Sequence, residues 1–282
     1  MSFFKQFPLV NYDIGLDGSI TKMVNIFRSV RPIQNYIDNP SLYKFYQIEN
    51  GERPDVISQK LYGTPDFYWT FFVVNEFLHD GYKVWPMSQE QMLKYLKSEY
   101  SGYAVNTRIS YTDNNIQNSL AGNFKLGETI TGETSGASGT LAKKNIDLNQ
   151  LVIRNMTSSL SFNGRKYISG AYDNSGSSPF EKITGSTSRD QVQTYDVWPY
   201  AEAPHHYYIL DEDGIEREYT PEIFINDQEY TKTSEELSYI SNRQYVYNLN
   251  DERSKIRVIN PNMIGEFVDT FERLINEWYI KK

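Results

Sequence analysis

The sequence predicts an α+β fold interrupted by a small all-β domain. Residues 43–49 alternate apolar and polar side chains, as a half-buried strand does. Residues 264–278 carry a large apolar side chain at 3-4-3-4 spacing, which is typical of an amphipathic helix. Gly, Ser, Thr and Asn dominate residues 101–194, between short β-prone runs. We therefore expect residues 1–100 and 195–282 to build one domain, with residues 101–194 inserted into it.

Composition limits the class of protein. The chain has 282 residues, 28 Lys plus Arg against 36 Asp plus Glu and no basic block, so nucleic acid is not an expected partner. It has no cysteine, which fits folding in a reducing compartment. No run approaches the roughly 20 apolar residues of a membrane span, and Pro8 and Asp13 interrupt the place of a signal-peptide core. We expect a soluble protein that does not enter membranes.

The first elements follow from local patterns. Residues 1–40 are mixed in character and are predicted to form an extended arm with one strand. The strand at residues 43–49 should end at Asn50-Gly51, which is a turn dipeptide.

Two helices and a returning strand come next. Pro54 suits the first position of a helix and Gly63 its left-handed C-cap. Thr64 is a good N-cap for a second helix that runs to about Asn75. Residues 82–86, YKVWP, are predicted to form the returning strand.

The second helix contains a run that is apolar on every side, FYWTFFVV at residues 67–74. A surface helix normally keeps a polar face, so the arm, the rest of the chain or another subunit must cover this one. Central aromatic residues dominate many interfaces. We therefore expect Tyr68, Trp69, Phe71 and Phe72 to be buried anchors of a partner interface.

The glycine-rich middle is expected to fold. FKLGETITG at residues 124–132 is echoed by FNGRKYISG at residues 162–170, which predicts two hairpin-like units in a small β sandwich or barrel. A flexible linker is the alternative, but NQLVIRNM at residues 149–156 is too apolar for one. The run beginning GETITG also resembles small β modules of phage tail and decoration proteins.

The C-terminal part predicts a hairpin, a strand and a helix. Residues 205–219 should turn at Asp213-Gly214. A charged turn beginning at residue 250 and a strand at residues 255–259 should follow, with Asn260 capping the last helix.

The apolar stripe of that last helix has two possible partners. Phe267, Phe271 and Trp278 belong to it. The stripe is either buried in its own domain or packed on a neighbouring subunit, and the second interpretation makes these three residues further interface candidates.

We find no signature of chemistry. The histidines are His79, His205 and His206, and adjacent residues on a strand point to opposite faces, so we expect no metal site. Serine-hydrolase, zinc-protease, phosphate-loop and dinucleotide motifs are missing from the sequence. We expect neither a catalytic residue nor a cofactor.

The segment GERPDVISQKLYGTPDFYWTFFVVNE, followed by DGYKVWP, resembles a LysM module. The resemblance implies a βααβ unit that binds N-acetylglucosamine polymers. Its groove would be formed by Asn50, Gly51, Asp55, His79 and Asp80. Glycan binding during infection is thus the alternative function. A peptidoglycan hydrolase is not expected, because the sequence lacks a catalytic signature for one.

A wider resemblance joins both ends of the chain. MVNIFRSV, LYGTPDFYWTFFVVNE, DGYKVWPMSQEQ and NDERSKIRVINP, the last leading into an amphipathic helix, are together similar to the baseplate wedge family of contractile-tailed phages known as gene product fifty-three. The similarity covers residues 1–100 and 207–282. It implies a non-enzymatic virion protein of the tail baseplate, assembled in the host bacterial cytoplasm, with six copies per baseplate. Its implied partners are other wedge proteins, including the sheath-initiating and ring-forming subunits, and the central hub.

Overall fold

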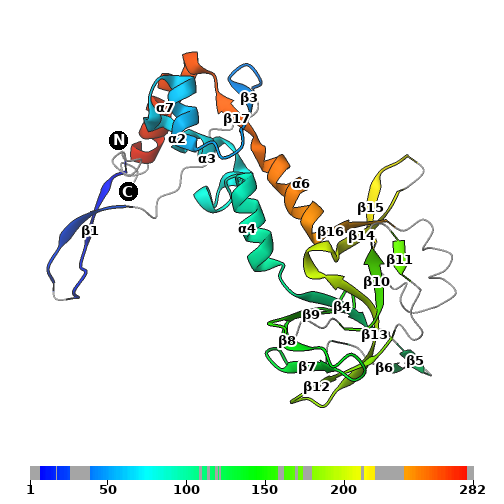
Figure 1. Cartoon of the computed structure of the whole chain (residues 1–282). Coiled ribbons are helices and arrows are strands. Elements are labelled where there is room, and N and C mark those ends of the chain that lie inside the picture. Colours follow the sequence, from blue (N-terminus) through cyan, green and yellow to red (C-terminus); the bar gives the residue numbers. More distant parts are fainter. Residues whose placement is uncertain are drawn as a thin grey trace. The chain divides into compact units, whose positions relative to one another are not determined.

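The computed structural model describes residues 7–16, 18–25, 39–107, 110–112, 115–117, 120, 122–157, 162–168, 171–173, 180–210, 213–219 and 238–277. Helices and strands are both abundant (Figure 1), which confirms the α+β class. The chain divides into two compact units: unit 1 is Met1–Met92 with Asn248–Lys282, and unit 2 is Leu93–Tyr247. The sequence-based domain boundaries after residues 100 and 194 stay a prediction.

Unit 1 begins with a hairpin. Strands β1 (Leu9–Tyr12) and β2 (Thr21–Val24) pair antiparallel, so the arm holds two described strands where one was predicted. Residues 26–38 of the predicted arm lie outside the described residues.

The next strand confirms one prediction and corrects another. β3 (Tyr43–Gln47) lies where it was predicted, but its partner is β17 (Lys255–Ile259), in antiparallel register. The predicted returning strand at residues 82–86 is wrong, because a 3-10 turn (Gly81–Lys83) stands at its start. The chain thus completes this sheet with a strand near its C-terminus.

The predicted caps at Gly63 and Thr64 are confirmed. α2 (Pro54–Tyr62) ends at Gly63, whose φ of 73° is the left-handed conformation that favours glycine. The side chain of Thr64 accepts a hydrogen bond from the backbone N–H of Asp66. The second helix is divided into a 3-10 turn (Pro65–Phe67) and α3 (Trp69–Val74).

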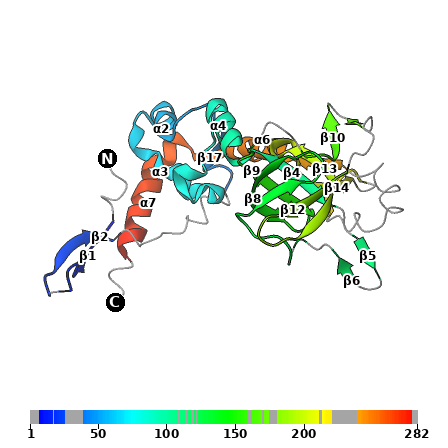
Figure 2. The ribbon, with the colours of Figure 1, turned by 60° about the horizontal axis from the view of Figure 1, so that its bottom comes forward.

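The apolar α3 is covered by the rest of its own unit. A final 3-10 turn (Pro261–Met263) leads into α7 (Ile264–Glu277), whose apolar stripe packs on Trp69. Asn260 makes no side-chain cap there, in contrast to the prediction. Figure 2 shows α2, α3, β17 and α7 gathered in one unit. A second cluster joins α2 and α3 to β3 and β17 through Ile57, Phe71 and Ile256.

Two helices were not predicted from the sequence. α4 (Gln89–Glu99) begins at a reciprocal cap, in which Ser88 Oγ accepts from the Gln91 N–H and Gln91 Oε1 accepts from the Ser88 N–H. α6 (Asn242–Ser254) includes the residues predicted to be a charged turn, so that turn is wrong. The boundary between the two units falls within each of these helices.

Unit 2 is built on a closed barrel. Strands β4 (Tyr103–Thr107), β9 (Gln150–Arg154), β8 (Ser138–Asn145), β7 (Thr129–Gly132), β12 (Lys182–Gly185) and β13 (Gln191–Pro199) follow each other around it, and β13 pairs back with β4. β10 (Arg165–Ile168) extends it by pairing parallel with β13, and β11 (Ala171–Asp173) pairs with β10. A separate hairpin joins β5 (Ser110–Thr112) and β6 (Asn115–Gln117).

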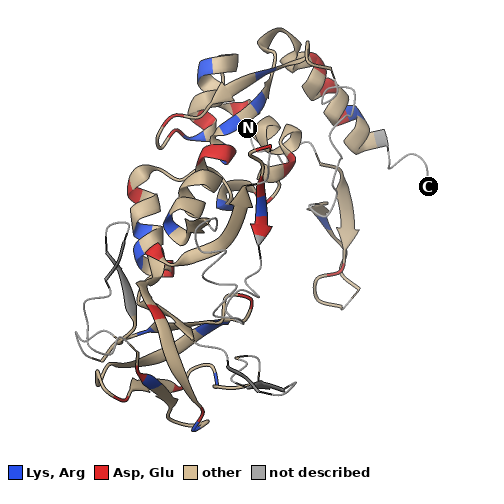
Figure 3. Cartoon of the chain, turned by 90° about the vertical axis from the view of Figure 1, so that its right-hand side faces the viewer, with Lys and Arg blue, Asp and Glu red and all other residues tan. Residues whose placement is uncertain are grey.

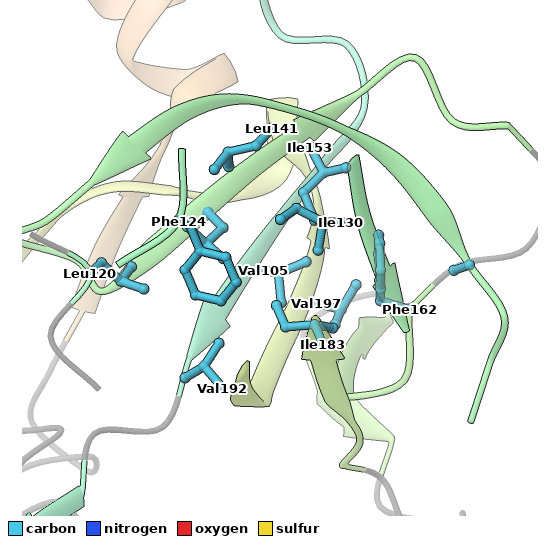
Figure 4. Close-up of a cluster of buried hydrophobic side chains, with 12 residues drawn as sticks. Val105, Leu120, Phe124, Ile130, Leu141, Ile153, Phe162, Ile183, Val192 and Val197 are labelled. Atoms are coloured by element: carbon cyan, nitrogen blue, oxygen red, sulfur yellow. The ribbon is translucent and has the colours of Figure 1, made fainter. Parts of the chain in front are cut away.

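The barrel interior is an apolar core that contains residues of the glycine-rich middle. Figure 4 shows the side chains of Phe124, Ile130, Leu141 and Ile153 converging in it. Closure leaves the six ring strands without a free edge in this sheet. The short loops rich in Gly, Ser and Thr therefore connect strands of a barrel.

A carboxylate clasp links two loops of the barrel reciprocally. Glu128 accepts hydrogen bonds from the backbone N–H groups of Thr187 and Ser188, both at 2.9 Å, and from Ser188 Oγ. Glu181 accepts the equivalent bonds from the N–H groups of Thr134 and Ser135, at 3.0 and 2.8 Å, and from Ser135 Oγ. Both carboxylates are buried, and each secures the loop that follows the other's strand.

The clasp identifies the internal repeat of the barrel. ETITGETS at residues 128–135 and EKITGSTS at residues 181–188 share Glu, Ile, Gly, Thr and Ser at the same offsets. Their strands β7 and β12 pair antiparallel, with Ile130 opposite Gly185 and Ile183 opposite Gly132. The predicted equivalence of residues 124–132 and 162–170 is wrong, since β10 lies outside the closed ring.

A second sheet of unit 2 contains the predicted C-terminal hairpin. β14 (Pro204–Leu210) pairs with β15 (Glu216–Tyr219) across Gly214, whose φ is 75°, and also with β16 (Ser238–Ser241). Within the described part of the chain, no helix has the length and apolar character needed to cross a membrane.

Candidate functional site

The predicted aromatic anchors of α3 fall into two groups. Trp69 and Phe71 are buried in the clusters of unit 1. Tyr68 and Phe72 are partly buried, and each ring lies near Tyr82, with centroids 6.3 and 5.4 Å apart. The chain itself covers the first pair, whereas the second pair keeps some exposed surface. The interface assignment of all four stays a prediction.

Two of the predicted C-terminal anchors, Phe267 and Phe271, belong to the same cluster as Trp69. Phe267 and Phe271 are buried, and their ring centroids lie 6.2 and 4.6 Å from that of Trp69. The stripe is therefore packed in its own unit, the first of the two alternatives considered. Trp278 lies outside the described residues. A partner contact by these three residues stays a prediction.

Polar side chains fasten the α2–α3 segment to the C-terminal strand. Asn75 Nδ2 donates to the Arg257 carbonyl at 2.9 Å, and Asn75 Oδ1 accepts from the Arg257 N–H at 2.8 Å. Tyr62 donates its hydroxyl proton to the Ile259 carbonyl at 3.0 Å. Burial raises the pKa of Tyr62 far above its ordinary value, so it is a permanent donor. The two ends of the sequence thus form one core.

The β1–β2 hairpin presents apolar side chains that this core does not cover. Its base is fixed, because Phe7 is buried in the cluster around Trp69 and Val24 packs against that cluster. Its outer part is exposed: Leu16 keeps 91% and Ile14 63% of its surface accessible. Further large apolar residues of the hairpin are exposed as well: Leu9, Tyr12, Ile20 and Met23.

The residues of the predicted glycan groove have varied roles. Asn50 Oδ1 accepts from the Gln89 N–H at 2.8 Å, and Asp55 forms a two-bond ion pair with Arg53. Gly51 has a φ of 74° and forms the turn after β3. The remaining two, His79 and Asp80, are exposed. The Asn50 side chain thus caps the N-terminus of α4. The LysM-like module and its glycan groove stay a prediction.

A cleft of about 570 Å³ lies in unit 2 and contains the adjacent histidines. The two Nδ1 atoms of His205 and His206 are 2.9 Å apart. The expectation that the two rings point to opposite faces is wrong, because the β14–β16 register shifts between Pro204 and His206. The cleft is also lined by tyrosine, lysine and acidic side chains: Tyr100, Tyr200, Tyr207, Lys143, Lys144, Asp147 and Glu218.

The His205 ring is held in place by stacking. The Tyr245 ring of α6 lies parallel to it within 8°, with centroids 3.7 Å apart. Burial lowers the pKa of His205 below its ordinary value; the nearby His206 and Lys143 lower it further, and Glu218 opposes them. The ring is therefore neutral over a wider pH range than a free histidine.

Sequence reasoning missed two features, the exposed apolar hairpin and the close histidine pair. The sequence contains a signal for the first and none for the second. The sequence has a Gly-containing turn flanked by apolar residues, namely Leu9, Ile14, Leu16 and Ile20. Predicting two strands in the arm would have placed these residues on a hairpin. The proximity of the two histidines depends on a bulge, for which we find no sequence signal.

Charge does not single out a further surface. Acidic and basic positions are interspersed on the helices and strands of both units (Figure 3). This distribution agrees with the lack of a basic block in the sequence.

Comparison with known proteins finds a match for the N-terminal part of the chain. Residues 1–120 match the family model described as base plate wedge protein 53. No curated protein matches the chain. The family match supports a structural role in the baseplate of a phage tail, in the company of other baseplate proteins.

Proposed function

Because residues 1–120 match the family model of base plate wedge protein 53, we propose that the chain is a joint between wedge proteins of a contractile tail. In this proposal six copies take part in the assembly of six wedges around the central hub. The partners are the sheath-initiating and ring-forming wedge subunits, and assembly takes place in the cytoplasm of the host. No enzymatic step is assigned to the protein.

The observation that carries this proposal is the β1–β2 hairpin. A two-stranded hairpin is marginally stable alone in water, and this one exposes six large apolar side chains between residues 9 and 23. Phe7 and Val24 hold its base on the folded core, so its outer part is available for a neighbour. Apolar surface of this kind is typical of a protein contact.

The predicted aromatic anchors have two roles in the proposal. Tyr68 and Phe72 are partly exposed and contribute directly to a neighbouring surface. Trp69, Phe71 and Phe267 are buried, so they act by fixing the helices that carry the contact. The proposal retains a LysM-like origin for β3, α2 and α3, with the surface given over to protein partners.

The test is co-assembly with the other wedge proteins of the same phage. Replacing Ile14 and Ile20 together by Ser removes about 3 kcal/mol of apolar burial at a contact, or roughly a 100-fold loss of affinity. Leu126→Ser is the matched control, since Leu126 in unit 2 has the same 63% exposure as Ile14. Size-exclusion chromatography and light scattering measure complex formation.

We expect the double variant to stay folded but to fail to form the complex. The Leu126→Ser variant should co-assemble normally. Co-assembly of the double variant with unchanged affinity would exclude the hairpin as the joint.

A further inference from the structure

We propose that the cleft of unit 2 binds one divalent transition-metal ion, with Nδ1 of His205 and Nδ1 of His206 as its protein ligands. This site is independent of the proposed baseplate function. Its preferred ions are Cu²⁺ and Ni²⁺.

The distance between the two nitrogens is the first argument. Histidine nitrogens bind such ions at about 2.0–2.1 Å, so two of them at a right angle lie about 2.9 Å apart, and at a tetrahedral angle about 3.3 Å apart. The observed Nδ1–Nδ1 distance is 2.9 Å. It fits neighbouring positions in the tetragonal geometry that Cu²⁺ and Ni²⁺ favour.

The backbone is the second argument. On a regular strand His205 and His206 would point apart, but the shifted register after Pro204 directs both rings into the cleft. Tyr245 then stacks on His205 and restricts its rotation. Two ligands held in place before binding lose less entropy when the ion arrives.

The remaining coordination positions have room for water. Among the described residues no group of three His, Cys, Asp or Glu side chains is close enough to hold an ion, so the protein supplies two ligands. The carboxylates of Asp147 and Glu218 line the same cleft, and so do the cationic side chains of Lys143 and Lys144, so the proposal rests on the geometry of the two nitrogens and not on net charge. The site is therefore open and exchangeable, unlike a closed four-ligand structural site.

The competing explanation is a hydrogen bond within the pair. One ring can donate its Nδ1–H to the Nδ1 of the other at the same distance. A bound ion requires both Nδ1 atoms to be unprotonated and both side chains to be present, whereas a hydrogen-bonded pair predicts no specific ion binding.

The experiment titrates tag-free, full-length protein with Cu²⁺ and with Ni²⁺ by calorimetry. His205→Gln and His206→Gln are compared with His79→Gln, which removes an exposed histidine of unit 1. We expect one ion per chain. Loss of either ligand should weaken binding by more than the roughly 10–100-fold that a change behind a ligand costs. His79→Gln should bind as the natural chain does.

Spectroscopy and folding controls make the result decisive. The electron paramagnetic resonance spectrum of the Cu²⁺ complex should show coupling to two nitrogens. The spectrum of each single ligand variant should show coupling to fewer. Circular dichroism without metal establishes that each variant is folded. Lack of saturable binding by the natural protein, or binding that survives loss of either His205 or His206, overturns the proposal.

Discussion

Replacing Glu128 by Gln should destabilise the barrel, because the reciprocal clasp depends on a charged acceptor. Glu128 is buried and accepts the N–H groups of Thr187, Ser188 and Lys125, the last at 2.6 Å. Burial alone raises the pKa of a carboxyl, but the N–H groups of Ser188, Lys125 and Thr187 and the Ser188 hydroxyl outweigh it. They hold the pKa of Glu128 below its ordinary value.

The magnitude follows from the donors that Gln can still satisfy. Its best orientation keeps an oxygen toward Thr187 and Ser188 and places the amide nitrogen near Ser188 Oγ, which can rotate to accept from it. The Lys125 N–H then loses its acceptor, which costs about 1–3 kcal/mol. The two retained bonds fall from charge-assisted to neutral strength, a further loss of roughly 1 kcal/mol each. We expect the free energy of unfolding of unit 2 to fall by about 3–5 kcal/mol.

Scanning calorimetry of the full chain measures this loss. For a unit of this size, a loss of about 3–5 kcal/mol lowers Tm by roughly 6–20 °C. Glu133→Gln is the control, since Glu133 lies in the same repeat but is exposed, and it should change stability by less than about 0.5 kcal/mol. Equal unfolding temperatures for Glu128→Gln and the natural protein would refute the clasp.

Three further predictions concern the same two units. A Cβ at Gly132 would lie 2.5 Å from Ser135 Oγ and 2.7 Å from Glu181 Oε1, so Gly132→Ala should cost about 1–3 kcal/mol. Gly122→Ala, which meets nothing within 4 Å, should be neutral in the same denaturant titration. Trp69→Ala should cost about 3–5 kcal/mol in unit 1, and exposed Phe45→Ala under about 0.5 kcal/mol. Because the folded-state pKa of Glu128 is depressed, its stabilisation is full above the ordinary carboxyl pKa of 4.5 and is lost as pH falls below it. A pH series of unfolding midpoints should show this loss in the natural protein and less of it in Glu128→Gln.

Local rules predicted the parts of the fold that depend on few residues. Pro54, Gly63 and Thr64 set the ends of α2 and of the segment that follows, because their backbone preferences act within one turn. The capping pair of Ser88 and Gln91 is an equally local signal, and it would have found α4.

Local rules could not predict the partner of strand β3, because that pairing joins residues far apart in the sequence. β3 pairs with β17, and its first residue Tyr43 lies opposite Ile259. The segment YKVWP alternates well enough for a strand, but the position beside β3 is taken by residues from the other end of the chain. Period-2 alternation indicates that a segment suits a β-sheet, but it does not indicate which strand will be its partner.

The candidate sites differ in the same way. The exposed hairpin was within reach of sequence reasoning, because its apolar residues flank a turn and need only the correct strand count. The histidine pair was not, since the argument that adjacent residues point apart fails at a bulge. Bulges change the direction of side chains without leaving a compositional trace.

The family match and the core of unit 1 cover different parts of the chain. The match ends at residue 120, yet the partners of Trp69 and Asn75 include Phe271 and Arg257, far beyond it. Residues 1–120 therefore hold the recognisable motifs without the strand and helix that complete their hydrophobic core. The barrel lies between the two segments of unit 1 in sequence, and its closed ring pairs its strands without help from unit 1. A closed barrel between the two segments of unit 1 is therefore compatible with the β3–β17 pairing, because its strands pair among themselves.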